Sequence, residues 1–158
     1  MNPASPPQLA IYIDADACPV KAEVYKVARR YGLRVLVVAN DWIAVPQEAF
    51  IERVVAPGGF DAVDDWIAAR AGPGDIVITA DIPLAGRCLA AGAAVVGPTG
   101  RAFTDGSIGS ALADRAIKEH LRAMGEITGG PRAMGPRDKS RFLSTLDETV
   151  VRLRRQRT

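Results

Sequence analysis

The stretch Ile11–Lys21, IYIDADACPVK, decides the fold. A short apolar run ends at Asp14, Asp16 follows after one small residue, and Cys18 and Pro19 begin a helical pattern. In α/β proteins, ligands bind where parallel strands have their carboxyl ends. Two carboxylates at such a point favour a divalent cation, because carboxylates repel each other and are costly to desolvate. We therefore expect a metal site for phosphate-ester chemistry here.

Outside this stretch, short apolar runs alternate with helical patterns along the whole chain, which is typical of β-α-β units with a mostly parallel sheet. The runs predict strands over residues 9–13, 35–39, 53–56, 76–80 and 94–97. Apolar spacing predicts helices over residues 19–31, 61–71, 83–92, 107–124 and 139–155. The fourth helix is expected to turn Ile108, Leu112, Ile117 and Leu121 inward, and the last one Phe142, Leu143, Leu146 and Val150.

The expected architecture is α/β, a three-layer α/β/α sandwich. Crossovers between parallel strands are right-handed, and this rule favours the strand order 3-2-1-4-5. In that order the winding direction reverses between the first and fourth strands. Asp14 and Asp81, which each follow one of these strands, would then be neighbours at the edge of the sheet where ligands bind.

Further acidic residues fall near the same edge. Asp81 can also be explained as a helix cap, because Pro83 follows two residues later. In GFDAVDDWI, Asp61 and Asp65 lie one helical turn apart, with Asp64 beside them. Acids in a first helical turn are also favoured by the helix dipole. We expect at least one of these three to face the site.

An all-oxygen ligand set without His or Cys suits Mg²⁺ or Mn²⁺ rather than zinc. We predict Asp14, Asp16 and Asp81 as catalytic residues, and the same three with Asp61 and Asp65 as metal ligands. Asp75, in a Pro-Gly-Asp turn, is expected to be structural.

Charge is unevenly distributed along the chain. Residues 1–114 hold 9 Lys/Arg and 13 Asp/Glu, whereas residues 115–158 hold 11 and 5. A basic end beside an acidic body suits a phosphate-binding surface, although charge alone favours the simpler explanation, a solvated helix face with a cationic tail. The candidates for gripping a nucleic-acid backbone are Arg132, Arg137, Lys139 and Arg141, in and after a Gly/Pro-rich loop.

Composition limits the classes of protein to consider. The length of 158 residues fits one domain, and no apolar run approaches the roughly 20 residues of a membrane span. Residues 1–8 resemble a disordered leader rather than a secretory signal. The two cysteines, Cys18 and Cys88, lie far apart and form no CxxC pair, which favours a reduced, cytoplasmic protein.

Four other side chains have an ordinary structural explanation. Cys18 stands at a helix start, where the thiolate is favoured, but no basic partner is evident. His120 is expected on the surface of the fourth helix, and Trp42 and Trp66 are expected to pack in the protein rather than stack on bases.

Several long strings of the sequence are specific enough to indicate a family. IYIDADACPVK, VAN, GFDAVDDWI, GDIVITADIPLA and GGPR, with the downstream Asp138 and FLSTLD, resemble the YaiI/YqxD family of bacterial proteins. The resemblance covers residues 11–152. Where that family often has Asn-Pro-Arg-Gly, this chain has Gly97-Pro98-Thr99-Gly100-Arg101, which weakens any phosphate-binding role for this turn.

The YaiI/YqxD family is similar to PIN-like domains, whose sheet edge carries acidic metal ligands and whose members are often ribonucleases. The resemblance implies one PIN-like domain over residues 9–155, with a C-terminal helical segment over 138–155. It assigns the strand-end acids to Asp14, Asp16 and Asp81, and the helical acid to one of Asp61, Asp64 or Asp65.

We therefore predict a metal-dependent nuclease with RNA as the favoured substrate, no membrane partner, and a homo-oligomer as a compatible state. Two alternatives stay open. Asp14-Ala15-Asp16 fits a phosphatase of the haloacid-dehalogenase type, in which the first Asp attacks phosphate and the second is the acid/base. The fold could also serve as a non-catalytic RNA-binding or regulatory module.

Overall fold

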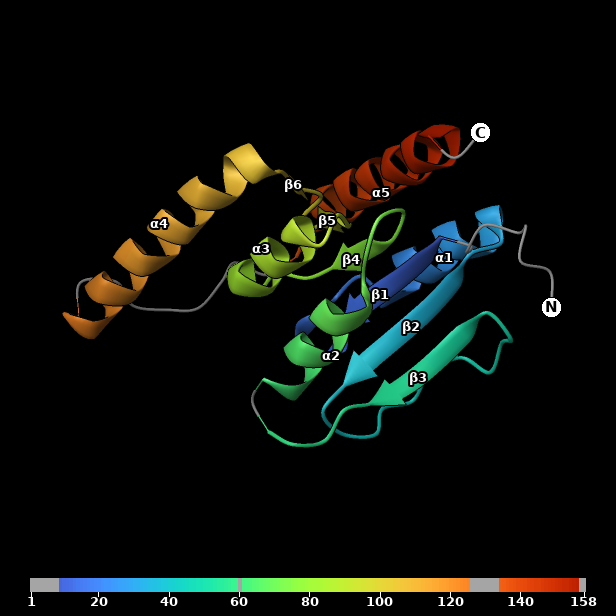
Figure 1. Ribbon diagram of the computed structural model, residues 1–158, viewed down its shortest axis with the longest axis horizontal. Coiled ribbons are helices and arrows are strands. Elements are labelled where there is room, and N and C mark those ends of the chain that lie inside the picture. The colour runs from blue at the N-terminus through green and yellow to red at the C-terminus, as the bar shows by residue number, and fades with distance from the viewer. Residues whose placement is uncertain (1–8, 60, 126–133, 157–158) are drawn as a thin grey trace.

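Six strands form one sheet in the order β3-β2-β1-β4-β5-β6 (Figure 1). The computed structural model describes residues 9–59, 61–125 and 134–156. The strands are β1 (Ala10–Asp14), β2 (Arg34–Ala39), β3 (Ile51–Val55), β4 (Ile76–Ile78), β5 (Ala94–Val96) and β6 (Ala102–Phe103). The first five are parallel, and β6 pairs antiparallel with β5.

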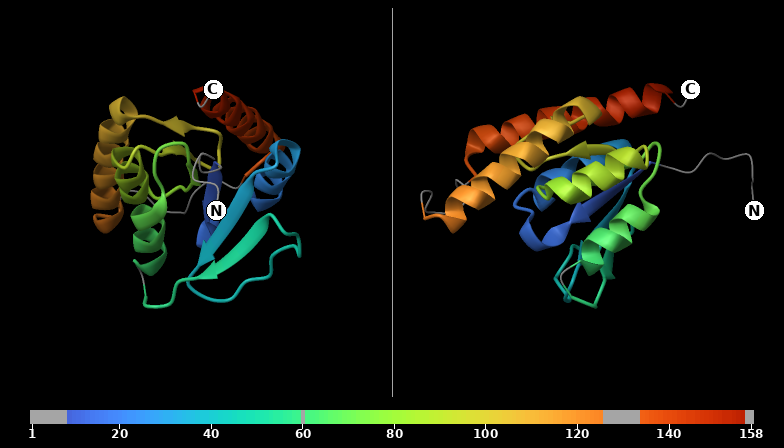
Figure 2. Two further views of the ribbon diagram at one scale, coloured as in Figure 1. Left: turned by 45° about the vertical axis from the view of Figure 1, so that its right-hand side comes forward. Right: turned by 60° about the vertical axis from the view of Figure 1, so that its left-hand side comes forward.

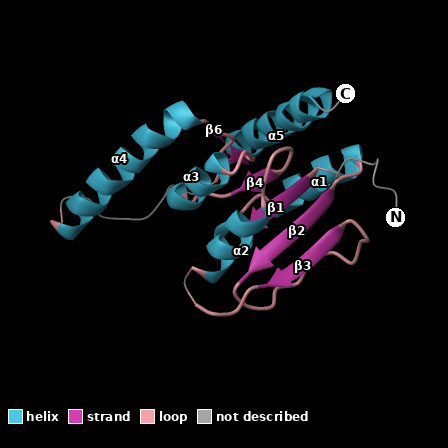
Figure 3. Ribbon diagram, viewed as in Figure 1, coloured by secondary structure: helices cyan, strands magenta, loops and turns pink. Residues whose placement is uncertain are grey.

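Helices cover both faces of this sheet, so the protein has three layers (Figures 2 and 3). A single 3-10 turn, η1 (Ala15–Ala17), follows β1 directly. The helices are α1 (Lys21–Tyr31), α2 (Ala62–Arg70), α3 (Ile82–Ala90), α4 (Asp105–Ala123) and α5 (Pro136–Gln156). α1 and α5 pack together on one face, and α2, α3 and the beginning of α4 cover the other. None of the helices in the described part of the chain combines the length and apolar character of a membrane span.

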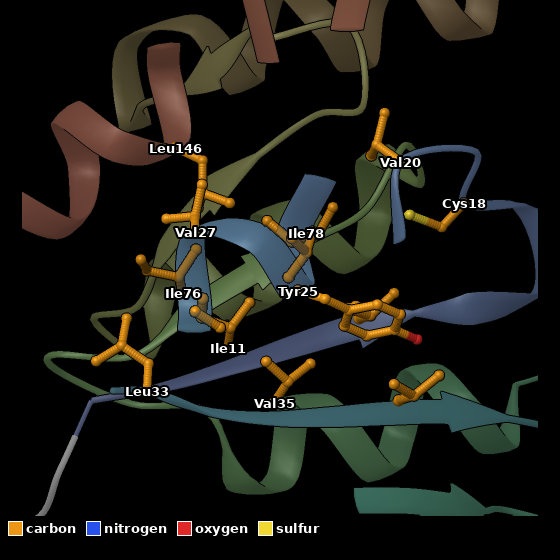
Figure 4. Close-up of a cluster of buried hydrophobic side chains, with 14 of the residues drawn as sticks. Ile11, Cys18, Val20, Tyr25, Val27, Leu33, Val35, Ile76, Ile78 and Leu146 are labelled. Carbon is orange, nitrogen blue, oxygen red and sulfur yellow. The ribbon is translucent and has the colours of Figure 1, made fainter. Parts of the chain in front are cut away.

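Alternation along β1 divides the core between the two faces, since successive side chains of a strand point to opposite sides. Ile11 and Ile13 belong to the cluster under α1 and α5, which Figure 4 shows together with Tyr25 and Leu146. Tyr12 belongs to the cluster under α2 and α3. Burial on both faces explains why the central strands are apolar throughout.

The predicted strand order is confirmed, and β6 is added to it. With two residues, β6 is too short to produce a period that a sequence pattern could reveal. α1 begins at Lys21 rather than at Pro19, because η1 and the turn after it occupy the intervening chain. Gly32 ends α1 as predicted, with φ of 67° and its N–H donated to the Ala28 carbonyl.

The prediction for α4 holds at Ile108, which packs against the cluster under α2 and α3, but fails further along the helix. Leu112 is 40% exposed and Ile117 58% exposed, Leu121 is only partly buried, and Ala111 is the one fully buried residue of the helix. The sequence shows that α4 is amphipathic, but beyond Ala111 its apolar side chains are largely exposed. α5 follows its prediction, with Phe142, Leu146 and Val150 buried and Leu143 packed against them.

The turn between β5 and β6 contacts α5 closely at Gly100. Its backbone has φ of 91°, and a Cβ atom there would lie 2.8 Å from the carbonyl carbon of Arg141 and 2.9 Å from the amide nitrogen of Phe142. The Gly100 carbonyl accepts a hydrogen bond of 2.8 Å from the Thr145 hydroxyl. Gly100 is therefore required both by its backbone conformation and by the proximity of the α5 backbone.

Gly100→Ala is expected to lower the free energy of unfolding by about 3 kcal/mol, because left-handed strain adds to a clash with backbone atoms that cannot rotate away. Gly32→Ala is the matched control. Gly32 has φ of 67°, but no atom lies within 4 Å of the position of its Cβ, so it should cost only about 1 kcal/mol. Urea unfolding of both variants measures the difference, and equal losses would show that the contact with α5 is unimportant.

Candidate functional site

β1 and β4 lie side by side, and their carboxyl ends hold the centre of the candidate site. Ile13 is the register partner of Ile78, so Asp14 is next to Thr79. The Thr79 hydroxyl donates a 2.8 Å hydrogen bond to Asp14 Oδ2, and it accepts one of 2.9 Å from the backbone N–H of Asp81. Thr79 is only 2% exposed. This buried hydroxyl thus connects the two segments that carry the strand-end acids.

Asp81 caps α3, as its alternative explanation predicted. Its Oδ1 accepts a 2.9 Å hydrogen bond from the Leu84 N–H, and Pro83 lies in the first turn. Within the described residues, Oδ2 of Asp81 and Oδ1 of Asp14 accept no hydrogen bond. Each carboxylate therefore keeps one oxygen for another partner, so a capping role and a ligand role are compatible.

A cavity of about 380 Å³ opens at this edge of the sheet. Its lining contains four carboxylates and, among the residues that the structure describes, no Lys or Arg side chain. The lining residues are Asp14, Asp16, Cys18, Asn40, Val63, Asp64, Thr79, Ala80, Asp81 and Pro98. Acids from β1, η1, α2 and the β4–α3 connection thus share one space without a neutralising partner.

Burial and repulsion between neighbouring acids together raise the pKa values of two of these acids. Burial raises the pKa of Asp14, the hydrogen bond from Thr79 lowers it, and the charges of Asp81 and Asp16 raise it further. Burial, followed by the charges of Asp81 and Asp14, raises the pKa of Asp64 to about 6. Ionising all of these acids together is unfavourable, so the cavity attracts positive charge.

The structure brings Asp14, Asp16 and Asp81 together, and from α2 it adds Asp64. The other two acids of GFDAVDDWI do not line the cavity. Asp65 forms a 2.8 Å ion pair with Arg87 and its side chain is 65% exposed, while Asp61 is exposed at the position before α2. The arrangement does not favour the prediction of Asp61 and Asp65 as ligands, and it points to Asp64 instead.

Among the described residues, no three acidic, His or Cys side chains are close enough to form a ready-made metal site. The four carboxylates surround open space rather than a closed shell. A structural zinc site encloses its ion with four protein ligands, which is a different arrangement. Mg²⁺ commonly binds one or two carboxylates and keeps several water molecules. The observed arrangement fits that second kind of site.

Sequence reasoning missed two polar residues of the site. Asn40 directly follows β2, which is the kind of signal that identified Asp14. Thr79 directly follows β4, but the predicted strand over residues 76–80 placed it inside the strand. With its amide oriented to satisfy its neighbours, the Asn40 nitrogen lies 3.2 Å from the Ala56 carbonyl oxygen and 3.0 Å from that of Gly59. Asn40 therefore holds the end of β2 to the segment that leads into α2.

Three of the four cations that the sequence suggested for nucleic-acid binding belong to the described residues, and none of these three lines the cavity. Arg132 lies outside the described residues. Arg137, Lys139 and Arg141 all belong to α5, and the Lys139 Nζ lies 4.0 Å from a Glu23 carboxylate oxygen. Their role in binding nucleic acid stays a prediction.

The structure also describes the four side chains that were expected to have ordinary structural roles. Burial raises the pKa of the Cys18 thiol, which agrees with the structural explanation and not with a reactive thiolate. His120 is exposed on α4, as predicted. Trp66 packs against Tyr12 with ring centroids 6.1 Å apart, but the packing prediction fails for Trp42, which is 64% exposed beneath the Arg53 guanidinium.

A larger depression of about 640 Å³ lies beside Trp42, along the β2–β3 connection. The charges that line it are largely neutralised, since Arg34 pairs with Glu52 at 2.6 Å and Glu48 pairs with Arg29 at 2.7 Å. It contains no group of converging acids, so the smaller acidic cavity is the better candidate for chemistry.

Comparison with known proteins places the chain among uncharacterised relatives. Residues 12–152 match the family described as "Uncharacterized BCR, YaiI/YqxD family". A UPF0178 protein of Caulobacter sp. (strain K31) is 65% identical over 145 residues, covering 92% of this chain and 96% of the relative. One of Rhodopseudomonas palustris (strain TIE-1) is 61% identical over 147 residues, covering 93% of each chain. UPF0178 protein BRADO3147 of Bradyrhizobium sp. (strain ORS 278) is 58% identical over 149 residues, covering 94% and 91%. No solved structure matches at a significant level.

Thr79→Val, which keeps the shape but removes the hydroxyl, is expected to lower the free energy of unfolding by about 2 kcal/mol. It leaves the Asp14 carboxylate and the Asp81 N–H without their shared partner. Thr79→Ser retains the hydroxyl and should lose less than Val does. Thermal and urea unfolding test this, and a Val variant as stable as wild type would remove the role given to the hydroxyl.

Asp64→Asn is expected to stabilise the protein at neutral pH. Because the folded-state pKa of Asp64 is about 6, above its usual 3.8, the wild type loses stability as pH rises from about 4 to 6. Asparagine avoids that loss and should gain about 1 kcal/mol near pH 7.5, a figure reduced for the partial exposure of the side chain, and nothing near pH 4. Unfolding in metal-free buffer across this range is the measurement, and a gain independent of pH would contradict it.

Proposed function

The chain belongs to the YaiI/YqxD family, and we propose that it is a nuclease that uses Mg²⁺ or Mn²⁺ and acts on RNA. One observation carries the proposal: four carboxylates line one cavity at the carboxyl edge of a parallel sheet, with no basic side chain among its described lining residues. A phosphodiester is an anion, and it would be repelled from this cavity unless a cation neutralised the acids. A divalent cation satisfies both the protein and the substrate.

The residues present fit such an ion. Asp14 and Asp81 would hold it, since each has one carboxylate oxygen that accepts no hydrogen bond from the described residues. The Thr79 hydrogen bond orients Asp14, as outer-shell partners of metal ligands commonly do. Bound there, the ion would supply positive charge to the phosphate oxygens and increase the acidity of water.

Asp16 and Asp64 complete the cavity from two other elements. Both are placed to hold and orient a water molecule that approaches the phosphate. Asp64 has a pKa of about 6 in the free protein, so it exchanges a proton close to neutral pH and suits the role of a general base. No side-chain nucleophile is needed in this scheme.

The phosphatase alternative has less support. Phosphatases of the haloacid-dehalogenase type need a Lys beside the two acids of the DxD motif. Asp14 and Asp16 do line the cavity, but no Lys is among its described lining residues. The non-catalytic alternative predicts neither RNA cleavage nor Mn²⁺ binding that depends on Asp14, so measurements of activity and of metal binding together separate the two.

Asp14→Asn is expected to reduce the rate of RNA cleavage in Mn²⁺ by at least about 100-fold, because it removes the negative charge of a ligand at the reacting phosphate. The matched control is Glu148→Gln, which should cleave at the wild-type rate. Glu148 is an exposed acid of α5 that does not line the acidic cavity. The substrates are RNA, single-stranded DNA and a phosphomonoester, each with Mn²⁺ or with chelator.

Three results would contradict this proposal in different ways. Equal turnover by wild type and Asp14→Asn would exclude a role for the acidic cavity. Hydrolysis of the phosphomonoester alone, with phosphate trapped on Asp14, would favour the phosphatase. Absence of turnover, together with calorimetry showing no Mn²⁺ binding that depends on Asp14, would favour the non-catalytic module.

A further inference from the structure

A second cavity adjoins the acidic one and carries the opposite charge. Its volume is about 310 Å³, and it lies between the β4–α3 connection, the β5–β6 turn and α4. Both cavities are lined by Ala80 and Asp81, so they meet at that point. Its other lining residues are Ile82, Arg101, Ala111, Asp114, Arg115, Lys118 and Arg122.

α4 is turned so that its charged side forms one wall of this cavity. Helices that cover a sheet normally place their apolar stripe inward and their charges outward. On α4, Arg115, Lys118 and Arg122 line the cavity, whereas Ile117 and Met124 are each 58% exposed. Figure 1 shows that α4 lies beside α3 and then extends beyond it, away from the sheet.

The positive charge of this cavity is only partly neutralised. Four cations face two acids in its lining, Asp81 and Asp114. Arg115 pairs with Glu119 at 3.2 Å on the exposed helix surface, which is a weak interaction in water. Lys118 and Arg122 form no hydrogen bond or ion pair with any residue that the structure describes.

The helix dipole accounts for only part of this pattern. A cation such as Arg122 in the last turn of α4 is favoured by the dipole. Arg115 and Lys118 lie further from that end, and Arg101 comes from the β5–β6 turn, with its guanidinium 5.2 Å from the centre of the Phe103 ring. Cations from two separate elements therefore converge on one space, which is what a bound anion requires.

We propose that this cavity binds a backbone phosphate of a single-stranded RNA, next to the phosphate that enters the acidic cavity. The inference rests on the proposed function. It extends that function by proposing that the RNA passes over Asp81, which lines both cavities. Lys and Arg contacts to phosphates position a nucleic acid without reading its sequence. Anchoring one phosphate here would hold the neighbouring phosphodiester against the acids that would otherwise repel it.

Lys118→Gln/Arg122→Gln tests the proposal, because neither side chain has a described partner whose loss would disturb the fold. The measurement is fluorescence anisotropy with an end-labelled, mixed-sequence oligoribonucleotide in chelator, so that no cleavage occurs. Losing the one phosphate contact assigned to this cavity should reduce the slope of log affinity against log salt by about 0.7, which is roughly a 5-fold loss of affinity at about 0.1 M salt.

The matched control is Lys26→Gln/Arg152→Gln. It removes the same charge from exposed positions on α1 and α5, which cover the opposite face of the sheet. It should bind RNA as the wild type does, apart from a small general effect of charge. Circular dichroism and thermal unfolding establish that both double variants are folded.

Each outcome has a definite meaning. The proposal is overturned if wild type does not bind the oligonucleotide, if the α4 variant binds as tightly as wild type, or if the control loses as much affinity. It is also overturned if inorganic phosphate competes as effectively as an unlabelled oligonucleotide, which would indicate a small-anion site. Selective loss in the α4 variant supports it even if wild type cleaves no RNA, and in that case only the nuclease proposal fails.

Discussion

The hydrogen bond between Thr79 and Asp14 joins the two strands on which the site depends. β1 and β4 are neighbours only because the sheet reverses its winding direction between them. The same hydroxyl also binds the N–H of Asp81, so one buried group fixes both strand-end acids. Everything else at the site is arranged around this contact: Asp64 approaches from α2, and Asn40 holds the end of β2.

This arrangement has an electrostatic cost, which is one reason for proposing a bound cation. Burial, and then the charges of the neighbouring acids, raise the pKa values of Asp14 and Asp64, so keeping these acids ionised destabilises the fold. A protein that needed these residues only for structure would be more stable with neutral ones. Retaining the acids makes sense when a cation removes the repulsion in the working state.

α4 shows a similar departure from the simplest fold. Its charged side faces a cavity, and its apolar side is largely exposed, so the helix gives up the burial that usually stabilises a covering helix. The two cavities then lie side by side with opposite charge and with Asp81 between them. This pairing of an acidic and a basic cavity is the observation behind the proposed RNA path, in which one phosphate would meet the cations and its neighbour would meet the acids through a metal ion.

The comparisons give the family of the chain without adding an activity. The family match spans residues 12–152, which includes the acids of β1, the whole of α4 and most of α5. The relatives are covered over 91–96% of their own length, so they consist of little more than this fold.

The sequence by itself determined the two ends of α1 to within two residues, because helical periodicity is a local property. It also determined the strand order and the meeting of Asp14 and Asp81, because the right-handedness of crossovers leaves few ways to order parallel strands. Only the tertiary structure decided which acid of α2 faces the cavity, since Asp61, Asp64 and Asp65 differ by helix rotation and Arg87, from α3, binds Asp65. The tertiary structure also decided which side of α4 faces the rest of the protein. An apolar stripe shows that a helix has two sides, but the neighbouring elements determine which of them faces the protein.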